Sequence, residues 1–308
     1  MAKQQFGGDW TEDKLSRIKK YFERYNIALK NQRFSREYID AFAGTGYREV
    51  RYEETDDAFL FPELAEPEVR RFLDGSARIA LNVDPGFTRF TFIEKNANKV
   101  KDLLRLANEF PGKDIRIEQG DANTWVQSIC RESWDYRRAV LFLDPFGMQV
   151  SWQTLEAVAG TKSIDTWILF PLCMSITRLL SKNEIPDESR CKRLDYLFGD
   201  RSWLDAFYRQ PASASTAKKQ RTFFDEPDEE AGTVRRIELS AIEEYYRARL
   251  RTIFARVANN SVQLKNSKNV PLYLLFFVAG NEKGAPIAVK IAESIMRRDQ
   301  PRCSERRI

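Results

Sequence analysis

Ala139-Val-Leu-Phe-Leu-Asp-Pro-Phe-Gly-Met-Gln-Val-Ser-Trp152 contains the clearest strand signal in this chain. Its first five residues are apolar and an acid, Asp144, follows them, a pattern typical of a strand buried on both faces of a sheet. Pro145 ends that strand because it has no N–H to give to a neighbouring strand. We therefore expect Asp144 at the carboxyl end of a strand, where open α/β sheets bind their ligands.

The residues at this strand end suit a flat ring that carries an amine, such as a nucleobase. Asp144 and the carbonyl of Pro145 can accept hydrogen bonds, and the ring of Phe146 can stack on a base. Gly147 lets a substrate approach the backbone. The alternative is a strand that ends in an ordinary Asx-type turn, with Phe146 in the core. From this segment alone, the two interpretations are equally supported.

The composition excludes several classes of chemistry. The 308 residues include no histidine, which rules out Ser-His-Asp and Cys-His catalysis and histidine zinc sites. The four cysteines show no C-x-x-C spacing and predict free thiols in a reducing cytoplasm, with no metal site. The sequence lacks an apolar run of about 18 residues, so we expect no membrane span. The net charge of +5 is compatible with a nucleic-acid partner.

Strands and helices alternate along most of the chain. Further strands are predicted at 36–40, 87–94, 115–118, 166–170 and 271–279, and helices at 10–30, 96–110, 124–129, 153–159, 194–207, 239–257 and 285–298. This order predicts an α/β fold with a Rossmann-like, doubly wound, mostly parallel sheet. Residues 1–173 and 271–308 would form that domain, and 174–270 a mainly helical insertion before the last strand. Two loops are expected, at 47–67 and 209–236.

Four acids are predicted to meet at one edge of this sheet, because each stands at or just after a strand end: Asp40, Glu94, Asp121 and Asp144. Gly44 and Gly46 form a turn after the first strand and can receive an amino-acid or phosphate group. An acid at the end of the second strand, here Glu94, suits two ribose hydroxyls. Asp121 can bond an adenine amine. The combination favours a nucleotide-like cofactor.

These motifs resemble those of Rossmann-like S-adenosylmethionine-dependent methyltransferases. Residues 38–46 resemble the glycine motif, 92–94 the ribose acid, 120–122 the adenine motif, and 144–147 the fourth motif of nucleic-acid amino-methyltransferases. More closely, residues 38–46, 92–94 and 143–152 together resemble the bacterial three-Cys-motif partner protein family, and the similarity covers most of the chain. That family is named for occurring beside a radical-type protein with a three-cysteine motif.

The resemblance implies the residues of a site. Cofactor contacts fall on Asp40, Phe42, Gly44, Gly46, Glu94, Asp121 and Ala122, and catalytic roles on Asp144, Pro145 and Phe146. The turn Asp-Pro-Phe-Gly departs from the Asp/Asn-Pro-Pro-aromatic motif of DNA amino-methyltransferases and is similar to tRNA guanine-N2 dimethyltransferases. The long loop after Gly46 is a second departure, because it separates the glycine turn from its helix.

We therefore expect a cytoplasmic S-adenosylmethionine-dependent N-methyltransferase that acts on an exocyclic amine of a nucleobase in DNA or RNA. The alternative is a catalytically weak methyltransferase-like subunit that binds a radical-type partner enzyme or nucleic acid. A third interpretation is a methyltransferase for a protein or a small molecule. The range 174–270 is rich in arginine and aromatic residues, so it either contacts nucleic acid or only covers the sheet.

Overall fold

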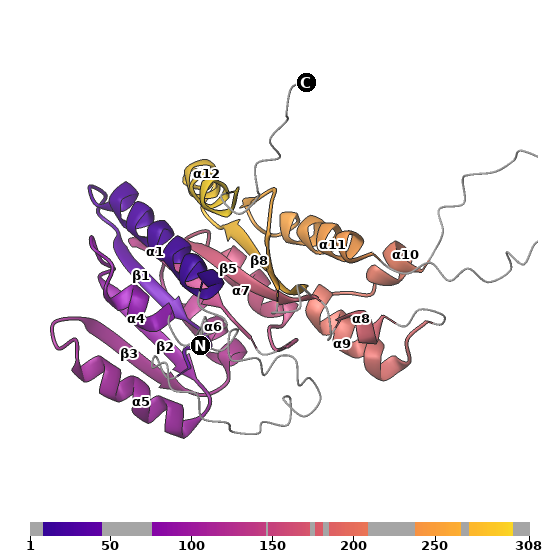
Figure 1. The fold of residues 1–308 in the computed structure, drawn as a ribbon, viewed down its shortest axis with the longest axis horizontal. Helices are drawn as coiled ribbons and strands as arrows, with labels where there is room; N and C mark the ends of the chain where they lie inside the picture. The colour runs from indigo at the N-terminus through magenta and orange to yellow at the C-terminus, as the bar shows by residue number, and fades with distance from the viewer. Residues whose placement is uncertain are drawn as a thin grey trace, which may run out of the picture.

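A computed structural model describes residues 9–44, 76–145, 147–172, 176–180, 185–208, 238–265 and 271–297. At its centre lies an eight-stranded sheet in the order β3-β2-β1-β4-β5-β8-β6, with β7 also paired to β8 (Figure 1). The strands are β1 (Ser35–Asp40), β2 (Arg89–Glu94), β3 (Asp114–Gln119), β4 (Arg137–Leu143), β5 (Ile164–Pro171), β6 (Arg256–Val257), β7 (Val262–Lys265) and β8 (Pro271–Ala279).

The sheet is mostly parallel. Strands β1 to β5 pair in parallel, whereas β8 runs antiparallel to β5 and to both β6 and β7. The order β3-β2-β1-β4-β5 arises because the chain turns back to the other side of β1 after β3, as in doubly wound folds. All eight residues of β5 are buried, including Asp165 and Thr166, and the apolar run 167–170 within it is typical of a strand buried on both faces. The predicted Rossmann-like α/β fold is confirmed.

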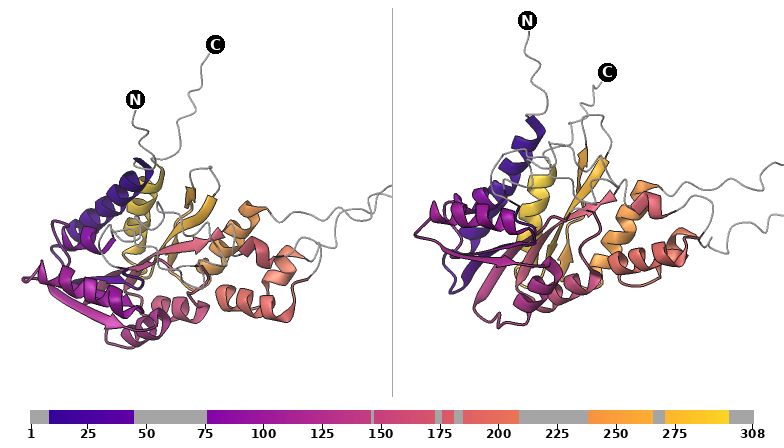
Figure 2. Two further views of the ribbon diagram at one scale, coloured as in Figure 1. Left: turned by 60° about the horizontal axis from the view of Figure 1, so that its bottom comes forward. Right: turned by 90° about the horizontal axis from the view of Figure 1, so that it is seen from below.

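Helices cover both faces of the sheet (Figures 1 and 2). One face packs against α1 (Asp9–Leu29), α4 (Ser76–Leu81), α5 (Ala97–Asn108) and α12 (Ala285–Met296). The other packs against α6 (Ala122–Cys130), α7 (Trp152–Gly160), α8 (Thr177–Leu179), α9 (Glu188–Phe198), α10 (Trp203–Phe207) and α11 (Leu239–Arg251). No helix in these described ranges is both long enough and apolar enough to span a bilayer.

Aromatic rings make up much of the core on both faces. On the α1 face, the ring of Tyr21 lies 5.2 Å from that of Trp167 and 5.0 Å from that of Phe277. On the α11 face, the ring of Tyr246 stacks 4.0 Å from that of Phe170. Such pairs contribute about 0.5–1.5 kcal/mol each beyond the burial of their surface. Helix α11 is therefore an integral cover of the sheet.

Both helices predicted within the range 174–270 differ from those in the structure. The helix predicted at 239–257 ends at Arg251, and Val257 lies in β6, which pairs with β8. The helix predicted at 194–207 is interrupted at Gly199, which has a φ of 94° and leaves no room for a Cβ beside Trp152. Strands as short as β6 and β7 carry too few residues for a periodic pattern.

Some predicted features lie outside the described residues. These are the 47–67 loop, the 209–236 loop and the two site residues Gly46 and Phe146. The division into a domain of 1–173 with 271–308 and an insertion of 174–270 stays a prediction. Strands β6 and β7 of that insertion nevertheless belong to the main sheet.

Candidate functional site

The four strand-end acids lie along the carboxyl edge of the sheet. Asp40 is the last residue of β1, where it is level with Phe92 of β2 and Phe142 of β4. Glu94 ends β2, level with Gln119 of β3. The remaining two acids come just after strand ends: Asp121 is two residues after β3, and Asp144 is the residue after β4. The parallel pairing therefore brings all four acids to one edge, as expected for a ligand site of an open α/β sheet.

Asp40 is fully buried and is held by three donors. The hydroxyl of Ser76, at the start of α4, donates to Oδ2 at 2.7 Å, and the hydroxyl of Tyr38 donates to the same oxygen at 3.1 Å. The backbone N–H of Phe42 donates to Oδ1 at 3.2 Å. Burial raises the pKa of Asp40 to about 6, although these hydrogen bonds oppose the shift, and the charge of Glu94 adds to it.

Glu94 joins the first turn to the end of β2. Its Oε2 accepts a hydrogen bond from the backbone N–H of Gly44 at 3.1 Å, and its Oε1 accepts one from the N–H of Asn96 at 2.7 Å. Gly44 has a φ of 60°, a conformation that glycine adopts without strain. The structure thus brings the glycine turn and the predicted ribose acid into direct contact.

Asp121 is exposed and forms the N-cap of α6. Its Oδ1 accepts from the backbone N–H of Thr124 at 3.0 Å and from the Thr124 hydroxyl at 3.1 Å. Ala122 is the first residue of that helix. Gly120 precedes the cap with a φ of 154°, and a Cβ there would lie 2.6 Å from Nε1 of Trp125. The Gly-Asp-Ala motif therefore has a local structural role, and its role at the adenine stays a prediction.

Asp144 and Pro145 are buried at the end of β4. The side chain of Asp144 is 2% exposed, and the strand alternation places it on the same face of the sheet as Phe142 and Val140, which pack towards α1 and α12. Gly147 has a φ of 68°, so the turn after Asp144 requires a residue without a Cβ. The catalytic roles predicted for this turn stay predictions.

Tyr273 of β8 is a neighbour of this site that the sequence did not single out. The residue is fully buried, and its hydroxyl has no hydrogen-bond partner in the described part of the chain. Burial raises the pKa of Tyr273 well above its ordinary value, and the charge of Asp144 adds to the rise. Because β8 is antiparallel, Tyr273 pairs with Pro171 at the carboxyl end of β5. A buried tyrosine inside a wholly apolar strand is the signal that could have revealed it.

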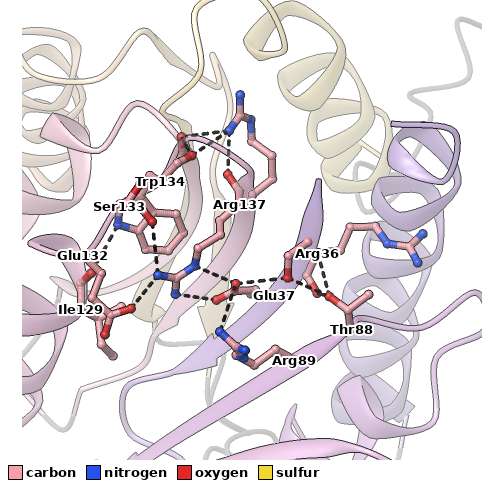
Figure 3. A network of polar contacts seen from close by, with 12 residues as sticks. Arg36, Glu37, Thr88, Arg89, Ile129, Glu132, Ser133, Trp134 and Arg137 are labelled. Atoms are coloured by element: carbon pink, nitrogen blue, oxygen red, sulfur yellow. Dashed lines mark hydrogen bonds and ion pairs between the residues drawn. The ribbon is translucent and has the colours of Figure 1, made fainter. Parts of the chain in front are cut away.

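The amino ends of the parallel strands form the opposite edge of the sheet, and the carboxylates there pair with arginines (Figure 3). Glu37 of β1 is 1% exposed and accepts two hydrogen bonds from Arg137 of β4, at 2.7 and 2.8 Å. Arg137 also donates to Glu132 at 2.6 Å. Arg89 donates to Asp114 at 2.8 Å. A cavity of about 380 Å³ lies beside these pairs, and its arginines are already bonded to acids.

Side chains that could ligate a metal are scattered along both edges. Within the described ranges, no three acidic, cysteine or histidine side chains are grouped as metal ligands would be. Cys130 and Cys191 are free thiols, and burial raises the pKa of Cys130 to about 12. A protonated thiol of this kind is a poor nucleophile.

Comparisons with known proteins bear on the fold of the chain and not on the residues of its site. No family model and no curated protein matches the chain. Among solved structures, protein LPL1258 from Legionella pneumophila, of the family DUF519, is 12% identical, covering 91% of this chain and 90% of its own, with a TM-score of 0.48. A putative S-adenosylmethionine-dependent methyltransferase from Listeria monocytogenes is 10% identical, covering 85% of this chain and 97% of its own, with a TM-score of 0.37.

The methyltransferase domain of bacterial CtHen1-C is also similar, at 10% identity over 86% of this chain and 99% of that domain, with a TM-score of 0.33. The strand order described above, with β8 antiparallel to β5, is that of a Rossmann-like α/β fold with a mostly parallel sheet. Membership of the three-Cys-motif partner family stays a prediction.

Proposed function

We propose that this chain is a methyltransferase that binds S-adenosylmethionine at the carboxyl ends of β1, β2 and β3 and modifies an exocyclic amine of a nucleobase in DNA or RNA. The observation that carries the proposal is the contact between Gly44 and Glu94. It places a glycine turn beside a carboxylate at the end of the second strand, as dinucleotide-type sites require.

The hydrogen-bonding groups at the carboxyl edge match those of the cofactor. Glu94 is a carboxylate whose oxygens each accept one backbone N–H, and a carboxylate has about four acceptor sites in all, so it can still accept from two ribose hydroxyls. Asp121 is exposed, and its two hydrogen bonds to Thr124 both use Oδ1. Bound S-adenosylmethionine would supply a methyl group already activated on its sulfonium sulfur.

The residues after β4 would position the substrate amine. Asp144 and the carbonyl of Pro145 would accept hydrogen bonds from the exocyclic amine, which orients its lone pair and favours the positive charge that develops on nitrogen. Phe146 would stack on the base. This arrangement needs no strong general base, in agreement with a chain that lacks histidine. A target inside a duplex would have to leave its stack.

A catalytically weak subunit that binds a partner enzyme or nucleic acid is the second candidate. The observation that favours it is that three of the acids already have structural roles. Asp40 is buried among three donors, Glu94 braces the first turn, and Asp121 caps α6. Each of these contacts would persist in a protein that never bound a cofactor, because local turns and caps alone are sufficient reasons for them.

Calorimetric titration of the purified chain with S-adenosylmethionine separates the two candidates. The proposal expects one site per chain, followed by transfer of labelled methyl to bulk DNA or bulk RNA. Absence of cofactor binding would contradict the proposal and favour the second candidate. Binding without transfer to either nucleic acid would keep the cofactor site and reject the nucleobase as the acceptor.

A further inference from the structure

A cleft of about 260 Å³ lies beside the turn that follows Asp144. Met148 of the turn and three residues of α9 line it: Lys192, Arg193 and Tyr196. Lys192 and Arg193 are exposed, and 44% of the surface of Tyr196 is exposed. Two cations, a phenol ring and a thioether thus line one cleft beside the proposed site.

Hydrogen bonds hold this part of α9 firmly against the turn. The hydroxyl of Tyr196 donates to the backbone carbonyl of Gln149 at 3.0 Å. Asn123 of α6 donates through Nδ2 to that carbonyl at 2.8 Å and to the Tyr196 hydroxyl at 3.2 Å. Through Oδ1, Asn123 also accepts from the backbone N–H of Ser151 at 2.9 Å. The position of the cleft relative to the end of β4 is therefore set by the protein itself.

The same contacts link the cleft to the proposed cofactor edge. Asn123 follows Asp121, the N-cap of α6, by two positions. Burial raises the pKa of Tyr196, and the nearby charge of Asp121 adds to that rise. Tyr196 therefore contacts both the helix that Asp121 caps and the turn predicted to face the substrate.

The charges in the cleft differ from the other charges of this helical region. Arg190 lies 3.3 Å from Asp187, and Arg201 lies 2.9 Å from Glu188 and 2.7 Å from Asp195. In contrast, neither Lys192 nor Arg193 forms an ion pair with any residue in the described part of the chain. Cations left over beside a site are the electrostatic signal of a polyanionic ligand.

We propose that this cleft binds the phosphodiester backbone of the nucleic-acid strand that presents its base to the Asp144 turn. The inference rests on the proposed function and deepens it, because it makes the substrate a strand of DNA or RNA and not a free nucleoside. Lys192 and Arg193 pair with phosphates next to the target nucleotide. The exposed ring of Tyr196 and the side chain of Met148 contact the adjoining base or sugar.

The test compares two double variants by fluorescence anisotropy with a labelled single-stranded RNA and the DNA of the same sequence, in a series of salt concentrations. Lys192→Ala with Arg193→Ala removes the cleft charges. Lys101→Ala with Arg105→Ala is the matched control, because it removes the same two residue types from exposed positions of α5, on the other face of the sheet. A calorimetric titration with S-adenosylmethionine accompanies each protein.

Affinity for nucleic acid falls as salt rises. Each phosphate of a single strand that a cation neutralises makes the slope of log affinity against log salt concentration steeper by about 0.7. The cleft variant, which lacks two such cations, should therefore have a slope shallower than that of the wild type by about 1.4. The control pair should change the slope much less, and cofactor affinity should stay the same in both. Either nucleic acid fulfils the proposal, and tighter binding of RNA than of DNA would identify the 2′-hydroxyl as a contact.

Equal slopes for the cleft variant and the wild type would overturn the proposal, as would equal changes in the cleft and control variants. Failure of the wild type to bind either strand, with normal cofactor binding, would also overturn it. Cofactor titration of the wild type decides the cofactor part of the proposed function separately. Tyr196→Ala tests the stacking contact, which does not depend on salt. This variant should bind both strands more weakly than the wild type, with the same slope of log affinity against log salt concentration.

Discussion

The two edges of the sheet use the same kind of residue in opposite ways. At the amino edge, carboxylates are neutralised by arginines, as in the pair of Glu37 with Arg137 (Figure 3) and the pair of Arg89 with Asp114. At the carboxyl edge, hydroxyls and backbone N–H groups hold the carboxylates of Asp40, Glu94 and Asp121.

On the proposed function, this difference separates an edge that stabilises the fold from an edge that binds the cofactor. An arginine bonded to a carboxylate cancels its charge and occupies both of its oxygens with charge-assisted hydrogen bonds. Neutral donors leave the charge in place, so an edge of this kind attracts hydroxyls and cations. S-adenosylmethionine carries both, in its ribose and in its sulfonium and amino groups. Substitutions at the two edges should therefore affect different measurements.

The largest expected effect lies at the amino edge. The side chain of Glu37 is 1% exposed, so its ion pair with Arg137 is buried. Glu37→Ala would break this pair and leave Arg137 with Glu132 as its carboxylate partner. Breaking a buried pair in this way should lower the free energy of unfolding by about 3–5 kcal/mol, as measured by urea denaturation. Asp102→Ala, which breaks the pair with the 73% exposed Arg105, should cost less than about 1 kcal/mol. Similar destabilisation in both variants would refute the contrast between buried and exposed pairs.

The next effect is a pH dependence shared by both edges. Burial raises the pKa of Asp40 to about 6 and the pKa of Asp165, near the start of β5, to about 7. Both values exceed the ordinary 3.8, so the folded chain binds these protons more tightly than the unfolded chain. The stabilisation is therefore complete below about pH 4 and disappears as the pH rises through about 6 and 7.

At about 1.4 kcal/mol per unit of pKa, these contributions are on the order of 3 kcal/mol for Asp40 and 4 kcal/mol for Asp165. Urea denaturation between pH 4 and pH 8 measures them. Asp40→Asn should remove the part that ends near pH 6, and Asp165→Asn the part that ends near pH 7. If the pH dependence of either variant equals that of the wild type, the carboxyl concerned does not titrate as described.

At the carboxyl edge, Asp144→Asn should lower methyl transfer by about 10²-fold, equivalent to about 2.7 kcal/mol, because it weakens one polar group at the reacting centre. Its affinity for S-adenosylmethionine should stay close to that of the wild type. Asp114→Asn, at the amino edge, is the control and should transfer methyl normally. Labelled-methyl assays beside cofactor titrations measure both. Full activity in Asp144→Asn would mean that the turn is structural and that the reaction occurs elsewhere.

The smallest expected effect concerns cofactor affinity. Glu94→Ala should weaken S-adenosylmethionine binding by about 1.5–3 kcal/mol, or roughly tenfold or more, because it removes a charge-assisted contact to the ribose. Glu132→Ala, which removes a carboxylate from the amino edge, should leave the affinity unchanged. Calorimetric titration compares the two. Equal affinities in Glu94→Ala and the wild type would place the cofactor elsewhere.

Much of this architecture could be predicted from short patterns in the sequence. The apolar run before Asp144 predicts a strand that the structure buries on both faces. Alternating strands and helices then require parallel pairing, which brings strand ends to one edge. The sequence also predicts a helix from Asn96, and this residue caps α5 through hydrogen bonds to residues two and three positions later. Such contacts span few residues, so local composition determines them.

The short strands β6 and β7 could not be predicted, because two and four residues carry no period and only the edge of β8 defines them. Gly199 ends α9 as its C-cap, and Trp152, which is distant in sequence, occupies the space that a side chain there would need. Likewise, the hydrogen bond from Ser76 to Asp40 and the effect of the Asp144 charge on the pKa of Tyr273 join residues that no local pattern relates.

By itself, the sequence determined the fold class, the strand-end position of the four acids and the absence of histidine chemistry, since backbone propensity, hydrophobic period and residue identity are local properties. Only the tertiary structure decided how those acids are held: Asp40 by the hydroxyls of Ser76 and Tyr38, Glu37 by Arg137, and Tyr196 of α9 against the turn at Gln149. Those contacts depend on how far each side chain reaches and on which face of an element it occupies, and both are set only when distant segments pack together.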